Sequence, residues 1–496
     1  MKAVGHAAGS ASRPRTSGLR GRGVGAGAAL VLAGIACLAL GGTSIAAPGD
    51  TAVSAVSPPA AGSSEPDESL LGTVEVNGSS EGLPPLPKLG VVPVVPTGPA
   101  DSLVHLVVAR DMDLSGQFDV LKDDVAPAGP FTHTTPLDLA AWRASGAEYV
   151  VRVFSQPAAS DSAKTELVGE AYLTPAAGKG KGGAPAGGPP SEPKPAFRTV
   201  LPTATTEIRA ASHRLVDQLL GAMTGRPGGF ASQMVYAEVV GRWRRIFEID
   251  SDGFDLRTTG PSEVTAISPA FGPGGQIYYA LSADYSPFKL AFGPGGTTVP
   301  VNAPGSIMGL AFNPDKSKLA LTVMDAGKST VWVGKPDSLQ QISSPPFANH
   351  PSFGPLGKMA YVAGTPVQRV YVDGKAVSPP GFMASAPVFC DTPSGLLVIY
   401  TVGVGAGADI IASDTGGGSI RRLTQHRGAN TYAACSPDGR LVAFFSTGKR
   451  KGSSGAAGND DPTAGLFIMP IQRPWLAKRI SAEVGESLRW EPIPAK

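Results

Sequence analysis

Three aspartates in one short segment are the residues of this sequence best suited to binding a metal. Asp250, Asp252 and Asp255 lie in the run Asp-Ser-Asp-Gly-Phe-Asp, whose closely spaced carboxylates could bind Ca²⁺. The same position in later repeats reads Asp373-Gly-Lys and Asp414-Thr-Gly. An aspartate shortly before a glycine is typical of a hairpin turn, where the carboxylate accepts backbone N–H groups and glycine takes a positive φ. We therefore interpret the segment as a turn, with calcium binding as the alternative.

No catalytic motif is found in the sequence. The zinc-protease motif HExxH is absent. The run Gly452–Gly455 comes nearest to the nucleophile motif GxSxG and fails at its fifth position. The run Gly327-Lys328-Ser329 resembles the end of a phosphate-binding loop, but Thr322 stands where the first glycine is required. We expect a protein that is not an enzyme and that needs no cofactor.

Length and charge narrow the class of protein further. The 496 residues suit two domains, or one domain and a repeat array, and 42% hydrophobic residues are enough for a substantial core. The formal net charge is +2, but the first 46 residues hold five basic residues and no acidic one, so the remainder carries 37 − 40 = −3. A basic surface for nucleic acid is therefore not expected.

The start of the chain predicts export. Residues 1–46 contain a basic segment, an apolar run from Val24 to Leu40, and small residues at Ser44 and Ala46, which is the pattern of a cleavable signal peptide. The alternative is a retained membrane anchor, because 17 apolar residues lie at the lower limit for crossing a bilayer. Residues 47–69, rich in Ala, Pro and Ser, predict a flexible linker. We expect a processed protein that is soluble, exported and not membrane-spanning.

Once the predicted signal peptide is removed with Cys37, two cysteines remain. Cys390 and Cys435 form no CxxC pair and have no neighbouring histidine cluster, which argues against zinc or thiol-redox chemistry. An exported compartment permits a disulfide. Each cysteine falls within a predicted core strand, however, and we therefore predict two separate buried thiols.

Residues 70–226 predict a small α/β domain, because helical and strand patterns alternate along them. The expected elements are helices over 101–116, 135–146 and 208–225 and strands over 148–154 and 165–173. The segment 174–195 has no core-forming residue and predicts a disordered surface loop.

Residues 228–496 contain a repeat of about 40 residues. Each copy has a buried residue, then a turn, then an apolar strand, and the turn prolines recur at intervals of 41, 41, 38 and 44 residues: Pro273, Pro314, Pro355, Pro393 and Pro437. Trp490-Glu-Pro forms a sixth copy after an insertion at 449–464. One four-stranded sheet per repeat, stable only against its neighbours, predicts a six-bladed β-propeller with WD40-like repeats. Because the first repeat lacks its innermost strand, we expect residues 487–490 to supply it and close the ring.

One residue of each repeat begins the innermost strand, three positions before the buried residue, and is expected near the rim of the central channel. These residues are Ser268, Gly309, His350, Ala386, Tyr432 and Ser487. Mostly small, they suit a surface for docking a protein better than an acid–base site. Tyr432 is the best candidate for an anchor, since aromatic residues concentrate binding energy, whereas His350 is interpreted as a rim residue without a special role.

The order of these parts resembles one family. A signal peptide, the segments VEVNGSSEGLPPLPKLGVVPVV, ARDMDLSGQFDVL and AAWRASGAEYVVRVF, then RRIFEIDSDGFDLRTTG and six repeats that include Ser436-Pro-Asp-Gly439, are similar to the TolB family of the Tol–Pal system. The resemblance covers about residues 70–496. It implies a periplasmic, non-enzymatic adaptor whose propeller binds the peptidoglycan-associated lipoprotein Pal through the six rim positions. It also implies that the N-terminal part binds an inner-membrane Tol component, and that the complex maintains outer-membrane integrity and constriction at division.

Two other functions remain as alternatives. A propeller can gate a serine peptidase, but the residues before this propeller show no nucleophile motif. A propeller can also bind a ligand or calcium as a sensor, for which the aspartates at 250–255 are the candidates.

Overall fold

The structure is a computed structural model that describes residues 66–72, 83–158, 161–175, 193–343, 347–425, 428–448 and 464–491. The predicted signal peptide, most of the expected linker 47–69, and most of the expected loops 174–195 and 449–464 lie outside the described residues. No helix within the described ranges is both long enough and apolar enough to cross a membrane.

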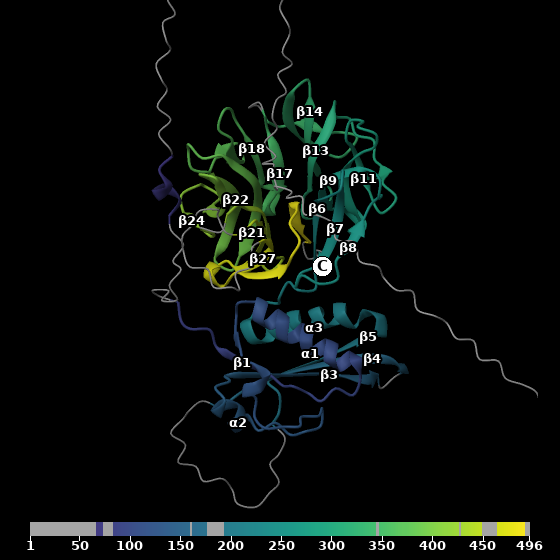
Figure 1. The fold of residues 1–496 in the computed structure, drawn as a ribbon, viewed down its shortest axis with the longest axis vertical. Helices are drawn as coiled ribbons and strands as arrows, with labels where there is room; N and C mark the ends of the chain where they lie inside the picture. Colours follow the sequence, from purple (N-terminus) through teal and green to yellow (C-terminus); the bar gives the residue numbers. More distant parts are fainter. Residues whose placement is uncertain are drawn as a thin grey trace, which may run out of the picture. The chain divides into compact units, whose positions relative to one another are not determined.

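The N-terminal part is an α/β domain (Figure 1). Its elements are β1 (Lys88–Val91), α1 (Pro99–Leu114), β2 (Asp119–Val120), α2 (Leu139–Ala144), β3 (Tyr149–Ala158), β4 (Asp161–Leu173), β5 (Phe197–Thr203) and α3 (Ile208–Thr224). The sheet has the order β2-β1-β3-β4-β5; β1 pairs in parallel with β2 and β3, and the other pairs are antiparallel. Helices α1 and α3 pack on each other and on this sheet. The predicted α/β fold is confirmed, with β1, β2 and β5 as additional strands.

Helix α3 shows how the sequence pattern produces the packing. Leu215 and Leu219 recur on one face of the helix and are completely buried. Gly225 ends the helix with φ of +79°, and its N–H donates to the carbonyl of Gly221. A left-handed glycine at this position satisfies an end carbonyl without steric cost.

A short 3-10 helix, η1 (Glu68–Leu71), lies at the end of the expected linker. The Asp67 side chain accepts a hydrogen bond from the Ser69 N–H and caps its start. Leu71 is completely buried among apolar residues of two neighbouring propeller blades, and Glu68 lies 3.4 Å from Arg422. These contacts attach the segment to the side of the propeller.

Six four-stranded antiparallel sheets form the second part, which confirms the six-bladed propeller (Figure 1). The first three sheets contain β9 (Thr265–Phe271), β10 (Ile277–Ser282), β11 (Lys289–Phe292) and β12 (Thr297–Thr298); β13 (Ser306–Phe312), β14 (Leu319–Asp325), β15 (Lys328–Gly334) and β16 (Gln340–Gln341); β17 (Asn349–Phe353), β18 (Met359–Ala363), β19 (Arg369–Val372) and β20 (Lys375–Ala376). The next two contain β21 (Ala384–Thr392), β22 (Gly395–Val404), β23 (Gly407–Asp414) and β24 (Ile420–Arg422); β25 (Asn430–Cys435), β26 (Leu441–Ser446), β27 (Gly465–Pro470) and β28 (Lys478–Ser481).

The sixth sheet combines both ends of the propeller. Its order is β29-β6-β7-β8, formed by β29 (Glu486–Trp490), β6 (Gln233–Val240), β7 (Trp243–Asp250) and β8 (Arg257–Thr259). The six innermost strands then contact one another in a closed series: β9, β13, β17, β21, β25, β29 and β9 again. The predicted closure by the C-terminal strand is therefore confirmed.

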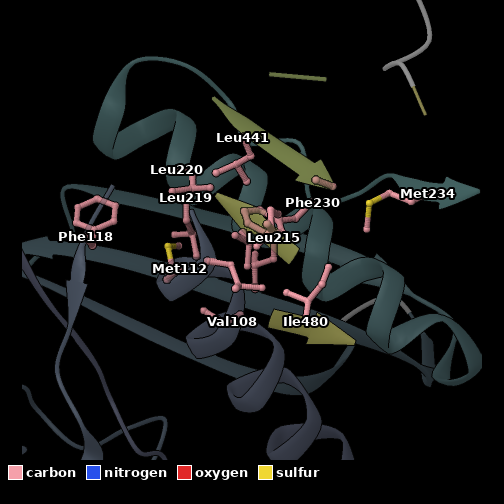
Figure 2. Packing of buried hydrophobic residues seen from close by; sticks show 14 of the residues in the cluster. Val108, Met112, Phe118, Leu215, Leu219, Leu220, Phe230, Met234, Leu441 and Ile480 are labelled. Atoms are coloured by element: carbon pink, nitrogen blue, oxygen red, sulfur yellow. The ribbon is translucent and has the colours of Figure 1, made fainter. Parts of the chain in front are cut away.

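One apolar cluster joins the α/β domain to the propeller. It includes Val108 and Met112 of α1, Leu219 of α3, and Leu441 and Ile480 of the propeller (Figure 2). All five side chains are buried. Because the cluster is continuous, helices α1 and α3 complete the core between the sheet of β25–β28 and the sheet β29-β6-β7-β8, as well as the core of their own sheet.

The prediction of two separate thiols is wrong. Cys390 of β21 and Cys435 of β25 form a disulfide, with their Cα atoms 5.4 Å apart. Cys435 occupies the place of the buried residue in its repeat, and Cys390 follows the equivalent residue, Phe389, in the preceding one. Innermost strands of neighbouring blades converge at the centre of a propeller, and these two positions therefore face each other.

Candidate functional site

Each predicted rim residue lies at a β-bulge. In every innermost strand the pairing register shifts by one residue at this point, so the strand carries one residue more than its partner. In β13 the extra residue is Met308, directly before Gly309. Bulges redirect side chains and end regular pairing, and they concentrate at binding sites.

Five of the six rim residues adopt the left-handed backbone conformation. Their φ angles lie between +48° and +58°: Ser268, His350, Ala386, Tyr432 and Ser487. This conformation costs a residue with a Cβ about 1–2 kcal/mol. Its repetition at equivalent positions shows that the bulge is a feature of the blade rather than of one side chain. Such strained backbone clusters at functional sites.

A signal for the bulge is present on the partner strand but was not used in the sequence interpretation. The residue opposite the bulge is a buried aromatic in five blades: Tyr236, Tyr279, Tyr361, Tyr400 and Phe444. In the remaining blade it is Thr322, which pairs directly with Gly309. A Cβ at Gly309 would lie 3.1 Å from the Thr322 Oγ1. The one blade without the aromatic is thus also the one without a rim side chain.

Hydrogen bonds connect rim positions of neighbouring blades. The Ser268 hydroxyl donates to the carbonyl of Met308 at 3.0 Å, and the Ala386 N–H donates to Nδ1 of His350 at 3.5 Å. Burial and the nearby charge of Arg489 lower the pKa of His350 to about 4. The imidazole is therefore neutral at neutral pH, and because its Nδ1 accepts, its Nε2 carries the proton.

Tyr432 is partly buried against the apolar cluster shared by the two domains. Burial raises the pKa of its phenol to about 12. The hydroxyl thus stays protonated and can donate to a partner while the ring is held by its neighbours. This combination of an immobilised ring and a polar tip is typical of residues that anchor an interface.

Large apolar side chains are exposed at the same end of the propeller. Val239 and Val240 end β6, Tyr285 follows β10, and Met383 and Val484 precede β21 and β29. Tyr285 is 95% exposed and Val239 is 60% exposed. Exposed apolar residues can contribute to a surface for another macromolecule. Phe254, Leu256 and Leu356 are exposed at the opposite end as well.

At the opposite end, Asp250 is the last residue of β7 and Asp252 lies in the turn between β7 and β8. Gly253 takes φ of +87° and its N–H donates to the Asp250 carbonyl at 2.8 Å, as the turn interpretation predicts. The third aspartate, Asp255, is exposed and lies 3.5 Å from Arg257. The three carboxylates thus do not converge on one point.

The two buried aspartates instead bind helix α3. Arg209 donates to Asp250 at 2.8 Å and to both oxygens of Asp252 at 2.5 Å. His213 lies 2.6 Å from Asp111 through Nδ1 and 3.7 Å from Asp250 through Nε2. His213, Asp250 and Asp252 could together hold a metal ion by their spacing. The Arg209 guanidinium, however, already supplies the positive charge at these carboxylates.

The pKa values of His213 and Asp250 depend on the charged residues around them. Burial by itself would lower the pKa of His213, but the carboxylates of Asp111 and Asp250 outweigh it and raise the pKa to about 10. Burial likewise acts to raise the pKa of Asp250, but hydrogen bonds from His213, Gln233 and Arg209 lower it to about 2. The group is a network of ion pairs that joins the α/β domain to the propeller.

We expect the substitution Arg209→Ala to destabilise the chain by about 3 kcal/mol. It would leave Asp250 and Asp252 buried without their guanidinium, which is far more costly than losing an exposed ion pair. Urea unfolding measures the effect. The control is Arg214→Ala, an exposed arginine of the same helix. Equal stability of the two variants would show that the network contributes nothing.

A cleft of about 560 Å³ lies between the two domains. Phe118, Tyr149 and Met223 line it from the α/β domain, and Pro393 and Arg440 line it from the propeller. No histidine, cysteine or carboxylate is among the described residues that line it. The cleft therefore offers apolar contacts but no pair of groups for acid–base catalysis.

Comparisons with known proteins agree with the fold. Residues 73–168 match the model of the TolB amino-terminal domain. The chain is 26% identical over 210 residues to the Tol-Pal system protein TolB of Methylococcus capsulatus, an alignment covering 41% of this chain and 43% of that protein. It is 29% identical over 182 residues to the protein of that name from Thiobacillus denitrificans, covering 34% and 35%. The chain thus spans less than half the length of these relatives.

A solved structure extends the likeness to both domains. The crystal structure of TolB from Acinetobacter baumannii superposes with a TM-score of 0.60 at 17% identity, covering 82% of this chain and 97% of that one. At this identity the superposition shows a common fold. Together with the matching amino-terminal domain and the two relatives, it shows that the chain is similar to TolB proteins.

Proposed function

We propose that this protein is a periplasmic, non-enzymatic adaptor of a Tol–Pal system whose propeller rim binds a peptidoglycan-associated lipoprotein. The observation that carries the proposal is the ring of six bulges, which presents the rim residues next to exposed apolar side chains at one end of the propeller. The relatives' names supply the partner system.

The rim suits a protein partner because it offers few groups for chemistry. Its members are one glycine, two serines, one alanine, one neutral histidine and one tyrosine. The Ser268 hydroxyl donates to a backbone carbonyl and His350 accepts from a backbone N–H, so no hydrogen-bonded nucleophile–base pair is described among the rim residues. Binding is therefore the activity that this surface supports. Tyr432 supplies the anchor, and His350 supplies an N–H donor.

The other parts of the chain complete the adaptor. Export through residues 1–46 would deliver the chain to the periplasm, and the N-terminal region would bind an inner-membrane Tol component. The α/β domain is proposed to span residues 70–226. The propeller over 228–496 would then help maintain outer-membrane integrity and constriction at division.

We expect Tyr432→Ala to weaken lipoprotein binding by about 2 kcal/mol, or roughly thirtyfold in Kd, because truncating an interface anchor has an effect of this size. Titration calorimetry with the soluble domain of the organism's own peptidoglycan-associated lipoprotein measures it. The control is Leu356→Ala, which truncates a fully exposed apolar residue on a turn at the opposite end of the blades.

Comparison of the unaltered chain with the two variants shows which part of the proposal is wrong if the expected result is not found. If the unaltered chain does not bind the lipoprotein, the proposed function is wrong. If the unaltered chain binds and Tyr432→Ala binds equally well, Tyr432 lies outside the interface. If Leu356→Ala weakens binding as much as Tyr432→Ala, the lipoprotein docks elsewhere than on the rim.

A further inference from the structure

The cleft between the α/β domain and the propeller contains one buried arginine that is incompletely paired. Arg440 lines this cleft, and its side chain is 8% exposed. Its Nη2 donates to the Thr224 hydroxyl at 2.8 Å, and its Nε lies 3.8 Å from the carboxylate of Asp438. Nη1 is buried and has no hydrogen-bond partner among the described residues. An unpaired N–H of a buried guanidinium is costly, and an acceptor bound beside it would remove that cost.

The hydrogen bond to Thr224 holds the guanidinium at the wall of the cleft. Thr224 is the last residue of helix α3, and it lines the cleft as Arg440 does. The threonine is held in turn, because its hydroxyl donates to the Leu220 carbonyl at 2.6 Å. The charged end of Arg440 is thus fixed between the two domains, beside a space of about 560 Å³. Small-molecule sites have volumes of about 300–1,000 Å³, so this space suits a small ligand.

Other polar side chains of the cleft already have hydrogen-bond partners. Each of them donates to a neighbouring group: Gln117 to the Ser115 carbonyl, Gln472 to the Ser394 hydroxyl and Arg473 to the Pro84 carbonyl. Among the described residues that line the cleft, Arg440 alone has a buried side-chain polar atom without a partner. A ligand therefore needs one acceptor group for Nη1 and few other polar groups.

Much of the remaining wall is apolar. Proline, aromatic and methionine side chains from both domains contribute to it: Pro85, Pro87, Phe118, Tyr149, Met223 and Pro470. The described lining also carries two arginines, Arg440 and Arg473, and no carboxylate. The charge of the cleft therefore favours an anion, and its surface favours an apolar body.

We propose that the cleft binds a medium-chain fatty acid, whose carboxylate accepts a hydrogen bond from Arg440 and whose alkyl chain lies against the apolar wall. Hydrogen bonds between a guanidinium and a carboxylate are among the strongest in proteins. An alkyl chain brings no further polar group into the cleft. A peptide would bring backbone N–H and C=O groups, which the already paired side chains would leave unsatisfied. The site goes beyond the proposed function, since it requires no protein partner.

Titration calorimetry with octanoate tests the site. We expect saturable binding of octanoate to the unaltered chain and roughly tenfold weaker binding to Arg440→Gln, which is the effect of losing a charge-assisted hydrogen bond. The matched control is Arg214→Gln, which removes the same charge from an exposed arginine of helix α3 that does not line the cleft. Absence of octanoate binding to the unaltered chain overturns the proposal, and so does an equal affinity of the two variants.

Three further compounds show which parts of the ligand matter. Acetate lacks the apolar body, octanol lacks the charge, and acetyl-leucyl-leucine carries a carboxylate on a peptide. We expect acetate and octanol each to bind at least about tenfold more weakly than octanoate. Octanol that binds as tightly as octanoate would overturn the pairing with Arg440, and acetate that does so would overturn the role of the apolar wall. Tighter binding of the peptide would assign the cleft to a peptide end instead of a fatty acid.

Photolabelling of the unaltered chain provides a second measurement, which remains valid if Arg440→Gln does not fold. A fatty acid with a diazirine on its alkyl chain is activated by light in the complex, and mass spectrometry locates the labelled residues. We expect the label on the walls of the cleft, at Phe118, Met223 or Ile471, and its loss when octanoate is added in excess. Labelling confined to other surfaces would contradict binding in the cleft.

Discussion

A chain that ends at Gly485 will lose the cooperative unfolding of the propeller. The truncation removes β29, which is the innermost strand of the sheet β29-β6-β7-β8. Leu488 and Trp490 are both buried, and the Trp490 indole N–H donates to Ser232 at 2.8 Å. Losing these two side chains costs about 5 kcal/mol, which is comparable to the whole stability of a domain. The pairing edge of β6 would also be uncovered, and β9 and β25 would lose their contacts with β29.

Differential scanning calorimetry and near-ultraviolet circular dichroism measure this effect. The matched control ends at Glu491, so it lacks a similar terminal segment but keeps β29. We expect the control to unfold as the full chain does. A truncated chain that melts cooperatively at the temperature of the control would show that the ring does not depend on its C-terminal strand.

Loss of the disulfide will have the next largest effect. The bond joins residues 45 apart in neighbouring blades. Its removal should lower the free energy of unfolding by about 4 kcal/mol, because the unfolded chain regains the freedom of a loop of this length. The double variant Cys390→Ser/Cys435→Ser in urea unfolding measures the change, and reduction of the unaltered protein should reproduce it.

The remaining cysteine provides the control. A Cys37→Ser chain keeps both propeller cysteines, and we expect its unfolding to match that of the unaltered chain under oxidising conditions. Thiol titration of the unfolded, non-reduced Cys37→Ser chain should find no free thiol. Two free thiols there would support the separate cysteines that the sequence predicted and contradict the bond.

The architecture follows from patterns that are local in the sequence. The apolar face of α3 and the glycine at Gly225 predict the helix and its end, because both act within a few residues. The recurring prolines and apolar strands predict one sheet per repeat. The closure of the ring was also predictable. The first repeat lacks an innermost strand, and the C-terminal residues form a strand that can take this place.

The candidate rim was located from the sequence but its backbone was not. The spacing before each buried residue identified Tyr432 and its five equivalents, because the repeat imposes a common position. The left-handed conformation of Tyr432 and His350 depends on pairing with the next strand, where an aromatic faces the bulge. The residues themselves have no turn signature, so no local preference indicates it.

Patterns in the sequence are therefore enough to predict the order of domains, the number of blades and the equivalent position in each innermost strand. The contacts between groups far apart in the sequence depend on the tertiary structure: Cys390 bonds to Cys435, and Arg209 pairs with Asp250 and Asp252. The physical reason is that local periodicity fixes how each strand folds. The angle at which separate blades and helices converge depends on the packing of the whole core.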